Sequence, residues 1–235
     1  MEALTTERIK ELYEKFIEIS PWKSWHQSFL SEVQAFSNLP DDELLKPQNQ
    51  EKLWRARGVS TIGPGEGVNV KGAYIDTGIA DQILQIRNKE WPEDRHKRAK
   101  AFQDAFDQVM GVVNKKHTTQ RPYAKLSRLF TALFPAELHT CFTWKSRRQV
   151  QELILGSKDY EFAEGAVLIR ARLREVLGEE KDVDETVWRA MFCWWIYENC
   201  DAIRRGDDVH VTSPPETEED KTEGVVDLLD IWPVS

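Results

Sequence analysis

The sequence of 235 residues predicts a mainly α-helical globular domain with one short β-hairpin. Apolar side chains recur at spacings of three and four residues through most of the chain, as they do on the buried face of an amphipathic helix. Proline and glycine interrupt this pattern where helices begin and end. With 40% hydrophobic residues the chain can build a core, which excludes collagen, disulfide-scaffold and wholly disordered classes.

Residues 1–57 are expected to form helices, and they are compatible with a separate helical subdomain. Ile9, Leu12 and Phe16 recur at helical spacing behind Thr5, a residue that can cap the first turn. Ser20-Pro21 then ends one helix and begins another, because serine accepts free amides and proline fits the first helical position.

The stretch 58–72 is the only one typical of β-structure. Val59–Ile62 and Val68–Val70 flank the turn-forming run Gly63–Gly67, which predicts a hairpin. A phosphate-binding loop would need lysine followed by serine or threonine, whereas Lys71 is followed by Gly72. We therefore expect a turn at this position and no bound nucleotide.

Helical spacing returns after residue 74 and predicts six further helices. They are expected at 79–91, 102–113, 121–134, 150–154, 162–177 and 182–204. Residues 1–205 would then form a single helical recognition domain. Residues 206–235 are polar, acidic and proline-bearing, and they indicate a linker or tail.

Charge is distributed unevenly along the chain, whose formal net charge is −8. From residue 206 onwards there are nine acidic residues and one lysine, which leaves residues 1–205 balanced. Within that balanced part, residues 84–150 carry fourteen basic and six acidic residues. An acidic total therefore coexists with a basic middle segment that could contact a polyanion.

Several classes of protein are excluded or disfavoured by simple patterns. No apolar run is long enough to span a membrane, and the first ten residues lack the apolar segment of a signal peptide. Three cysteines at irregular spacing favour reduced thiols in a cytoplasmic protein. The five histidines are scattered, so no metal or cofactor site is expected, and no catalytic motif indicates an enzyme.

The basic segment supplies the candidate site. Arg121, Lys125 and Arg128 share one face of a predicted helix, and further cations open the next helix beside Trp144. The candidate phosphate contacts are Lys115, Lys116, Arg121, Lys125, Arg128, Lys145, Arg147 and Arg148. Trp144 and Tyr123 are candidates for stacking on a base. The alternative is an ordinary solvated helix face.

Two groups of motifs resemble the N-terminal region of McrB-type restriction proteins. Leu53-Trp54 with Gly58–Gly65 resembles their "LW…VS.IG.G" stretch, and 121–135 resembles their "RP..K..RL..ALFP" signature. Leu173–Gly178 and Phe192–Glu198 fit the same family pattern, so the resemblance covers roughly residues 50–200.

That resemblance implies a DNA-recognition domain, often one that reads a modified base. In the family it precedes an AAA+ motor that forms a ring and drives a partner nuclease against foreign DNA. Walker A and nuclease motifs are absent from this chain. The hypothesis is thus a non-catalytic domain that binds double-stranded DNA. The alternative is a module that docks the nuclease or the motor without touching DNA.

Overall fold

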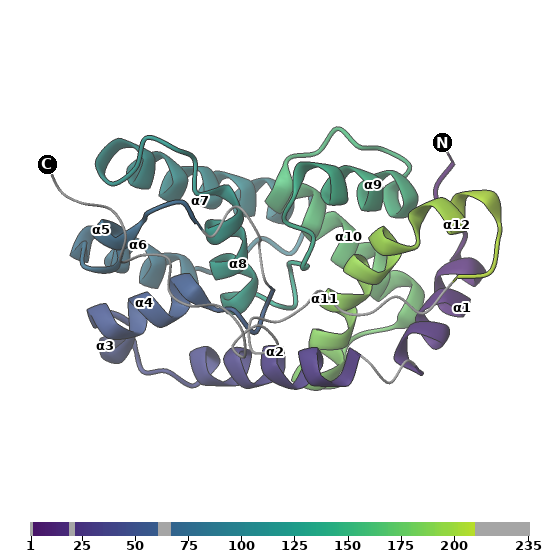
Figure 1. Ribbon diagram of the computed structural model, residues 1–235, viewed down its shortest axis with the longest axis horizontal. Helices are drawn as coiled ribbons and strands as arrows, with labels where there is room; N and C mark the ends of the chain where they lie inside the picture. Colours follow the sequence, from purple (N-terminus) through teal and green to yellow (C-terminus); the bar gives the residue numbers. More distant parts are fainter. Residues whose placement is uncertain (1, 19–21, 61–66, 210–235) are drawn as a thin grey trace, which may run out of the picture.

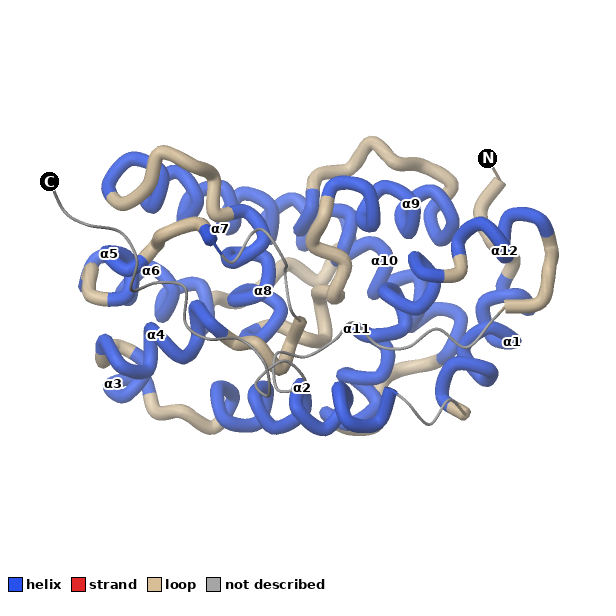
Figure 2. Tube along the Cα trace, viewed as in Figure 1, coloured by secondary structure: helices blue, strands red, loops and turns tan. Residues whose placement is uncertain are grey.

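The computed structural model describes residues 2–18, 22–60 and 67–209, and these residues form helices joined by short loops (Figures 1 and 2). The first six helices are α1 (Thr6–Ile17), α2 (Trp22–Ser37), α3 (Asp41–Leu44), α4 (Pro47–Arg55), α5 (Lys71–Tyr74) and α6 (Thr77–Arg87). The next six are α7 (Arg95–Lys116), α8 (Tyr123–Leu133), α9 (Trp144–Leu155), α10 (Phe162–Leu177), α11 (Val183–Glu198) and α12 (Cys200–Arg205). The mainly helical prediction is confirmed.

Local sequence signals fix several helix boundaries. The Thr5 hydroxyl accepts from the Arg8 amide at 3.2 Å, and Asp182 accepts from the Glu185 amide at 2.9 Å. Gly156 ends α9 with a φ of 72°, a left-handed conformation that favours glycine. These caps explain where α1 and α11 begin and where α9 ends.

One predicted helix is divided in the structure. The sequence predicted a single helix from 182 to 204, but α11 ends at Glu198 and α12 begins at Cys200. Between them, the Asn199 side chain donates to the Trp195 carbonyl at 2.9 Å. The backbone of Asn199 leaves helical geometry at this point, with a φ of −101° and a ψ of 10°.

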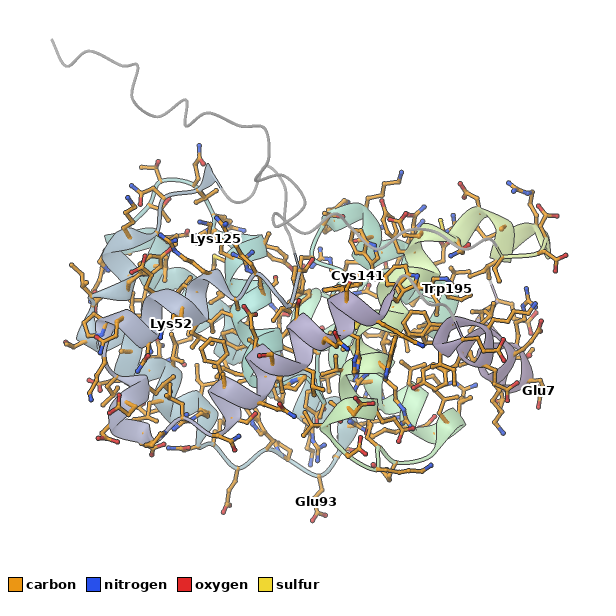
Figure 3. All side chains as sticks on the ribbon, turned by 60° about the horizontal axis from the view of Figure 1, so that its bottom comes forward. Glu7, Lys52, Glu93, Lys125, Cys141 and Trp195 are labelled. Carbon is orange, nitrogen blue, oxygen red and sulfur yellow. The ribbon has the colours of Figure 1, made fainter. Side chains whose placement is uncertain are left out.

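The core is continuous from α1 to α12. Phe16 of α1 lies 5.8 Å from Trp195 of α11 between ring centres, so the N-terminal helices pack against the C-terminal ones. α8 crosses the middle of the molecule (Figure 1), and α7 pairs most extensively with α10. Figure 3 shows Cys141 and Trp195 inside the body and Glu93 at its edge. None of the described helices has both the length and the apolar character that a membrane crossing requires.

The predicted hairpin is not supported. No strand occurs in the described residues, and Lys71, expected near the end of the second arm, begins the short helix α5. Residues 61–66, which include most of the predicted turn, lie outside the described residues, as does the acidic tail from 210 onwards. On the first arm, the backbone of Gly58–Ser60 is held by side chains, as described next, and not by a neighbouring strand.

Candidate nucleic-acid interface

Arg128 lies in the core, not on the predicted basic face. Its side chain is 0% exposed, and it donates to the Ser60 carbonyl at 3.1 Å and to the Trp54 carbonyl at 3.4 Å. Lys125, one turn earlier, is also buried. The periodicity placed both side chains correctly on one face of α8, but this helix is surrounded by protein. Neither residue can therefore reach a phosphate, and the prediction is corrected here.

The buried Arg128 belongs to a structural unit that fixes the segment Gly58–Ser60. From α2, the Trp25 indole donates to the Gly58 and Val59 carbonyls at 3.1 Å, and the Glu32 carboxylate accepts from the Val59 amide at 3.2 Å. Burial raises the pKa of Glu32. A Cβ on Gly58 would lie 2.7 Å from the Ser28 carbonyl oxygen, so only glycine allows this close approach. The two stretches that carry the family resemblance thus pack against each other as core.

Arg147 is likewise buried, with 2% of its surface exposed. Its guanidinium donates to the Tyr123 hydroxyl, stacks 5.4 Å from the centre of the Tyr123 ring and lies 3.4 Å from the Glu161 carboxylate. Burial raises the pKa of Tyr123, which keeps its hydroxyl protonated. Both residues join the start of α8 to the start of α9, so their predicted roles as phosphate contact and stacking residue are also corrected.

Three predicted site residues remain together on the surface: Trp144, Lys145 and Arg148, which we call the α9 cluster. Trp144 is 62% exposed, and the guanidinium groups of Arg147 and Arg148 lie 4.6 and 4.7 Å from its ring centre. Cations at these distances hold an indole in place by attraction to its π-electrons. Neither Lys145 nor Arg148 has an ion pair within the part of the chain that the structure describes.

The position of the α9 cluster at a helix start makes this end of α9 strongly positive. The Thr143 hydroxyl accepts from the Ser146 amide at 3.1 Å and caps the helix. Acidic side chains usually occupy a first helical turn because they complement the partial positive charge of the backbone amides. The first turn of α9 has none, and basic side chains stand there instead. Glu161 pairs with Arg147 at 3.4 Å, and Lys145 and Arg148 have no ion pair with a carboxylate of the described residues.

The other predicted cations are divided between two places. Arg121 is exposed just before α8, whose first residue, Tyr123, touches Arg147 under the α9 cluster. Lys115 is exposed near the end of α7. Lys116 bonds Asp76 at 3.1 Å and so serves a contact between α7 and α6.

That contact also contains His117, which sequence reasoning had treated as a scattered histidine. Its Nε2 atom lies 2.8 Å from Asp76 Oδ2, and this bond, with help from Lys116, lowers the pKa of Asp76 to about 2. The chain makes room for the imidazole at Gly72, where a Cβ would lie 2.4 Å from His117 Nδ1. The arrangement joins α5 and α6 to the end of α7.

The remaining reactive side chains are enclosed. Burial lowers the pKa of His139 to about 3 and raises that of Cys193 to about 12, so the first stays neutral and the second stays a thiol at pH 7. Cys141 is buried in the same way. Within the described residues no three histidine, cysteine or carboxylate side chains converge as metal ligands do.

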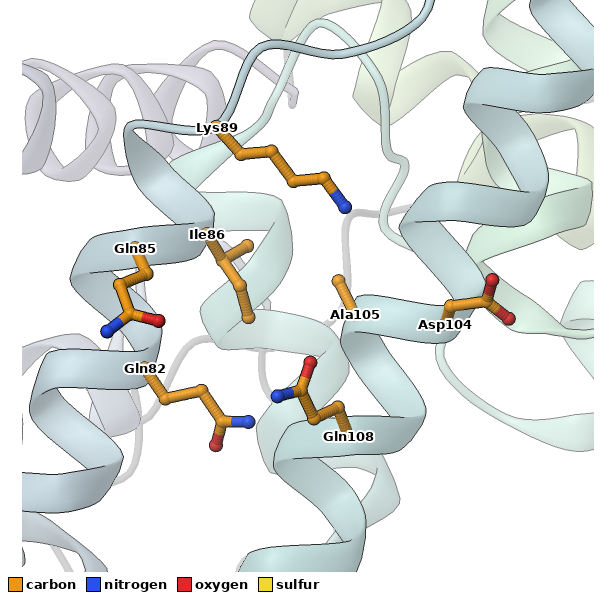
Figure 4. A pocket seen from close by; sticks show the side chains of 7 residues that line it. All are labelled: Gln82, Gln85, Ile86, Lys89, Asp104, Ala105 and Gln108. Carbon is orange, nitrogen blue, oxygen red and sulfur yellow. The ribbon is translucent and has the colours of Figure 1, made fainter.

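A shallow groove between α6 and α7 was not predicted. It encloses about 170 Å³ and is lined by three glutamines, with Lys89 at one end (Figure 4). Gln82 and Gln108 extend into it from opposite helices, whereas Asp104 points away. The glutamines lie on the polar faces of both helices, where sequence patterns do not distinguish a groove from an ordinary solvated surface.

No family model, curated protein or solved structure matches this chain significantly.

Proposed function

We propose that this chain is the non-catalytic DNA-recognition domain of an McrB-type restriction or anti-phage defence protein. In this proposal it works in the cytoplasm and contacts the phosphate backbone of double-stranded DNA through the α9 cluster, with Arg121 at its edge. An AAA+ motor and a partner nuclease would act on the DNA that it holds. The McrB-type assignment rests on the motif resemblance, and the DNA contact rests on the α9 cluster.

The observation that carries the DNA contact is the pair Lys145 and Arg148 near the start of α9, neither of which has an ion pair with a carboxylate of the described residues. Lys145 and Arg148 stand where the helix backbone is itself positive, and folding alone gives no reason for this placement. Backbone amides and cations at a helix start are a common way to bind phosphate. Trp144, which is 62% exposed between two guanidinium groups, offers a flat apolar surface to a base or a sugar.

A cluster this small binds DNA weakly on its own. Each neutralised phosphate contributes about −0.9 to the slope of log affinity against log salt concentration, so a few contacts give a shallow slope and a modest affinity. Several copies held on one ring would bind far more tightly, because each later contact becomes intramolecular. The ring assembly implied by the family resemblance suits a weak individual site.

The test is duplex binding by the full chain at about 50 mM salt, with DNA that is plain or carries a modified base. Replacing Lys145 and Arg148 together by alanine should weaken binding roughly tenfold or more. The matched control replaces Lys23 and Lys52, two exposed lysines on α2 and α4, and should bind like the wild type. The proposal would be overturned if the chain binds none of the duplexes. It would also be overturned if the control variant loses as much DNA affinity as the Lys145 and Arg148 variant.

A second candidate is a docking module for the motor or the nuclease. It is favoured by the exposure of Trp144 beside arginines, since tryptophan and arginine dominate the energetics of protein interfaces. Arg148→Glu would separate the two functions in a pull-down with the motor and nuclease subunits. If the wild-type chain binds no DNA and the Arg148→Glu variant no longer binds the motor or the nuclease, the docking function is supported.

A further inference from the structure

The acidic tail leaves the folded body beside the helix that carries the α9 cluster. α12 packs on α9, where Arg204 Nη2 bonds Glu152 Oε2 at 2.8 Å. At the other end of the pair, burial raises the pKa of Cys200, and the nearby charge of Lys145 opposes that rise. α12 therefore runs along α9 in the same direction (Figure 1), and the chain after Gly206 continues from the far end of α9.

The bond between Arg204 and Glu152 lies about two helical turns from the α9 cluster. Glu152 and Trp144 are eight residues apart on one helix, a rise of about 12 Å. Val209, the last described residue, still packs on the core. The acidic run 216–223 begins seven residues later, and seven residues reach at most about 25 Å. The run ends fourteen residues after Val209, and fourteen residues reach at most about 50 Å, which brings the start of α9 within range of the run.

The two segments are also complementary in charge. Residues 206–235 contain nine acidic residues and one lysine, whereas the remainder of the chain is balanced. Lys145 and Arg148 carry no ion pair with a carboxylate of the described residues. An excess of acid and a set of uncompensated cations thus lie within reach of each other in one molecule. At low salt they attract over about 10 Å or more.

We propose that the acidic run 216–223 occupies the α9 cluster and that DNA must displace it to bind. The regulatory role rests on the proposed function, whereas the contact between the tail and α9 does not depend on it. Because the tail is tethered, its local concentration is in the millimolar range, so even a weak contact would compete with DNA. Such a domain would not bind ligands that carry few negative charges, and it would bind a long polyanion that can displace the tail.

The contact is tested in the full chain with a carbodiimide, a reagent that joins an amine to a carboxylate it touches, followed by mass spectrometry. Lys145 should be joined to acids of 216–223 at low salt and released from them at about 0.5 M salt, where the Debye length is only about 4 Å. Lys158 is the internal control: it is exposed just beyond the end of α9, the end where Arg204 of α12 bonds Glu152. Links that favour Lys158, or none at all, would overturn the contact.

The regulatory role is tested with a tail variant, Glu216→Gln, Glu218→Gln, Glu219→Gln and Asp220→Asn. This variant should bind duplex DNA about three- to tenfold more tightly than the wild type at about 50 mM salt. The reason is that the apparent affinity for DNA is the intrinsic affinity multiplied by the fraction of molecules whose α9 cluster is not occupied by the tail. The control makes the same change in net charge elsewhere, with Glu2→Gln, Glu14→Gln, Glu18→Gln and Asp42→Asn, all exposed.

The outcomes separate the two proposals. Links at Lys145 with no DNA binding by either variant would remove the proposed function and leave the tail contact standing. DNA binding that depends on Lys145 and Arg148, with no links and no tightening in the tail variant, would remove the tail contact and leave the function. Equal tightening in the control variant would show a general charge effect and overturn the regulatory role.

Discussion

The Arg128 guanidinium donates to the Ser60 carbonyl over 3.1 Å, and this bond joins the two sequence stretches on which the family resemblance rests. Both partners are buried, and Trp54 from the first stretch accepts from the same guanidinium. In this chain the two stretches are therefore joined in the core, where α4, the segment after it and α8 pack together. The resemblance informs the architecture and leaves the binding surface to be identified from other residues.

Replacing Arg128 by alanine should destabilise the fold by about 3 kcal/mol, because it leaves a cavity and removes the donors of two buried carbonyls. Arg128→Lys should recover only part of this loss, since an ammonium cannot reproduce the planar fork of a guanidinium. Arg121→Ala, at an exposed position seven residues earlier, should change stability by less than about 0.5 kcal/mol. Urea unfolding measures all three, and a stable Arg128→Ala protein would refute the structural role.

Gly165 allows α9 and α10 to approach, because a Cβ there would lie 2.1 Å from Gln151 Nε2. Gln151 is fully buried and donates to the Tyr160 carbonyl at 3.2 Å, so it has little freedom to move. Gly165→Ala should cost about 1–3 kcal/mol despite the better helix propensity of alanine. In a protein that already carries Gln151→Ala, Gly165→Ala should leave the free energy of unfolding unchanged or raise it. The effects of the two substitutions would then not be additive, which thermal or urea unfolding would reveal. Additive losses would contradict the steric account.

Asp76 should make the stability of the protein depend on pH in the acid range. Its pKa is lowered from 3.8 to about 2 by His117, so its stabilising contribution is complete above pH 4 and is lost as the pH falls through about 2. Asp76→Asn should therefore be less stable than the wild type at pH 6, and the two proteins should converge near pH 2. A stability difference that stays constant between pH 6 and pH 2 would contradict this account.

Trp144→Ala should leave stability within about 0.5 kcal/mol of the wild type, because the side chain is 62% exposed. If Trp144 stacks on nucleic acid, the same change should weaken DNA binding by about 1–3 kcal/mol, and Trp144→Phe should retain part of the affinity. Thermal unfolding and a duplex titration give both numbers. Unchanged DNA affinity would assign Trp144 to protein docking or to no contact.

The helices could be predicted because each one is an amphipathic repeat bounded by residues with local effects. The helix 162–177 was predicted at its observed bounds, since Gly178 stops it and its apolar pattern is regular. The hairpin prediction failed because β-branched residues near glycine are typical of a hairpin, but the sequence does not show which side chains bond to their backbone. In the structure, side chains of Trp25, Glu32 and Arg128 satisfy the backbone of Gly58–Ser60, and these partners are distant in sequence.

The candidate site was predicted only in part, for a related reason. A charged residue in a helix repeat indicates a face but not what covers that face. Lys125 and Arg128 are buried, whereas Lys145 is exposed and Arg148 is half-buried, although both pairs have the same local spacing. Buried arginines that bond carbonyls cannot be distinguished from surface arginines until the partner helices are known. The start of α9 itself is fixed locally, by the bond between the Thr143 hydroxyl and the Ser146 amide.

The salt dependence of duplex binding tests the central claim most directly. The log of the association constant should fall against the log of salt concentration with a slope of about −2 to −3 between 50 and 200 mM, as expected for two or three phosphate contacts. Replacing Lys145 and Arg148 together by alanine should reduce that slope to between about 0 and −1. A slope that is the same in the wild type and in this double variant would show that the start of α9 does not hold the phosphates.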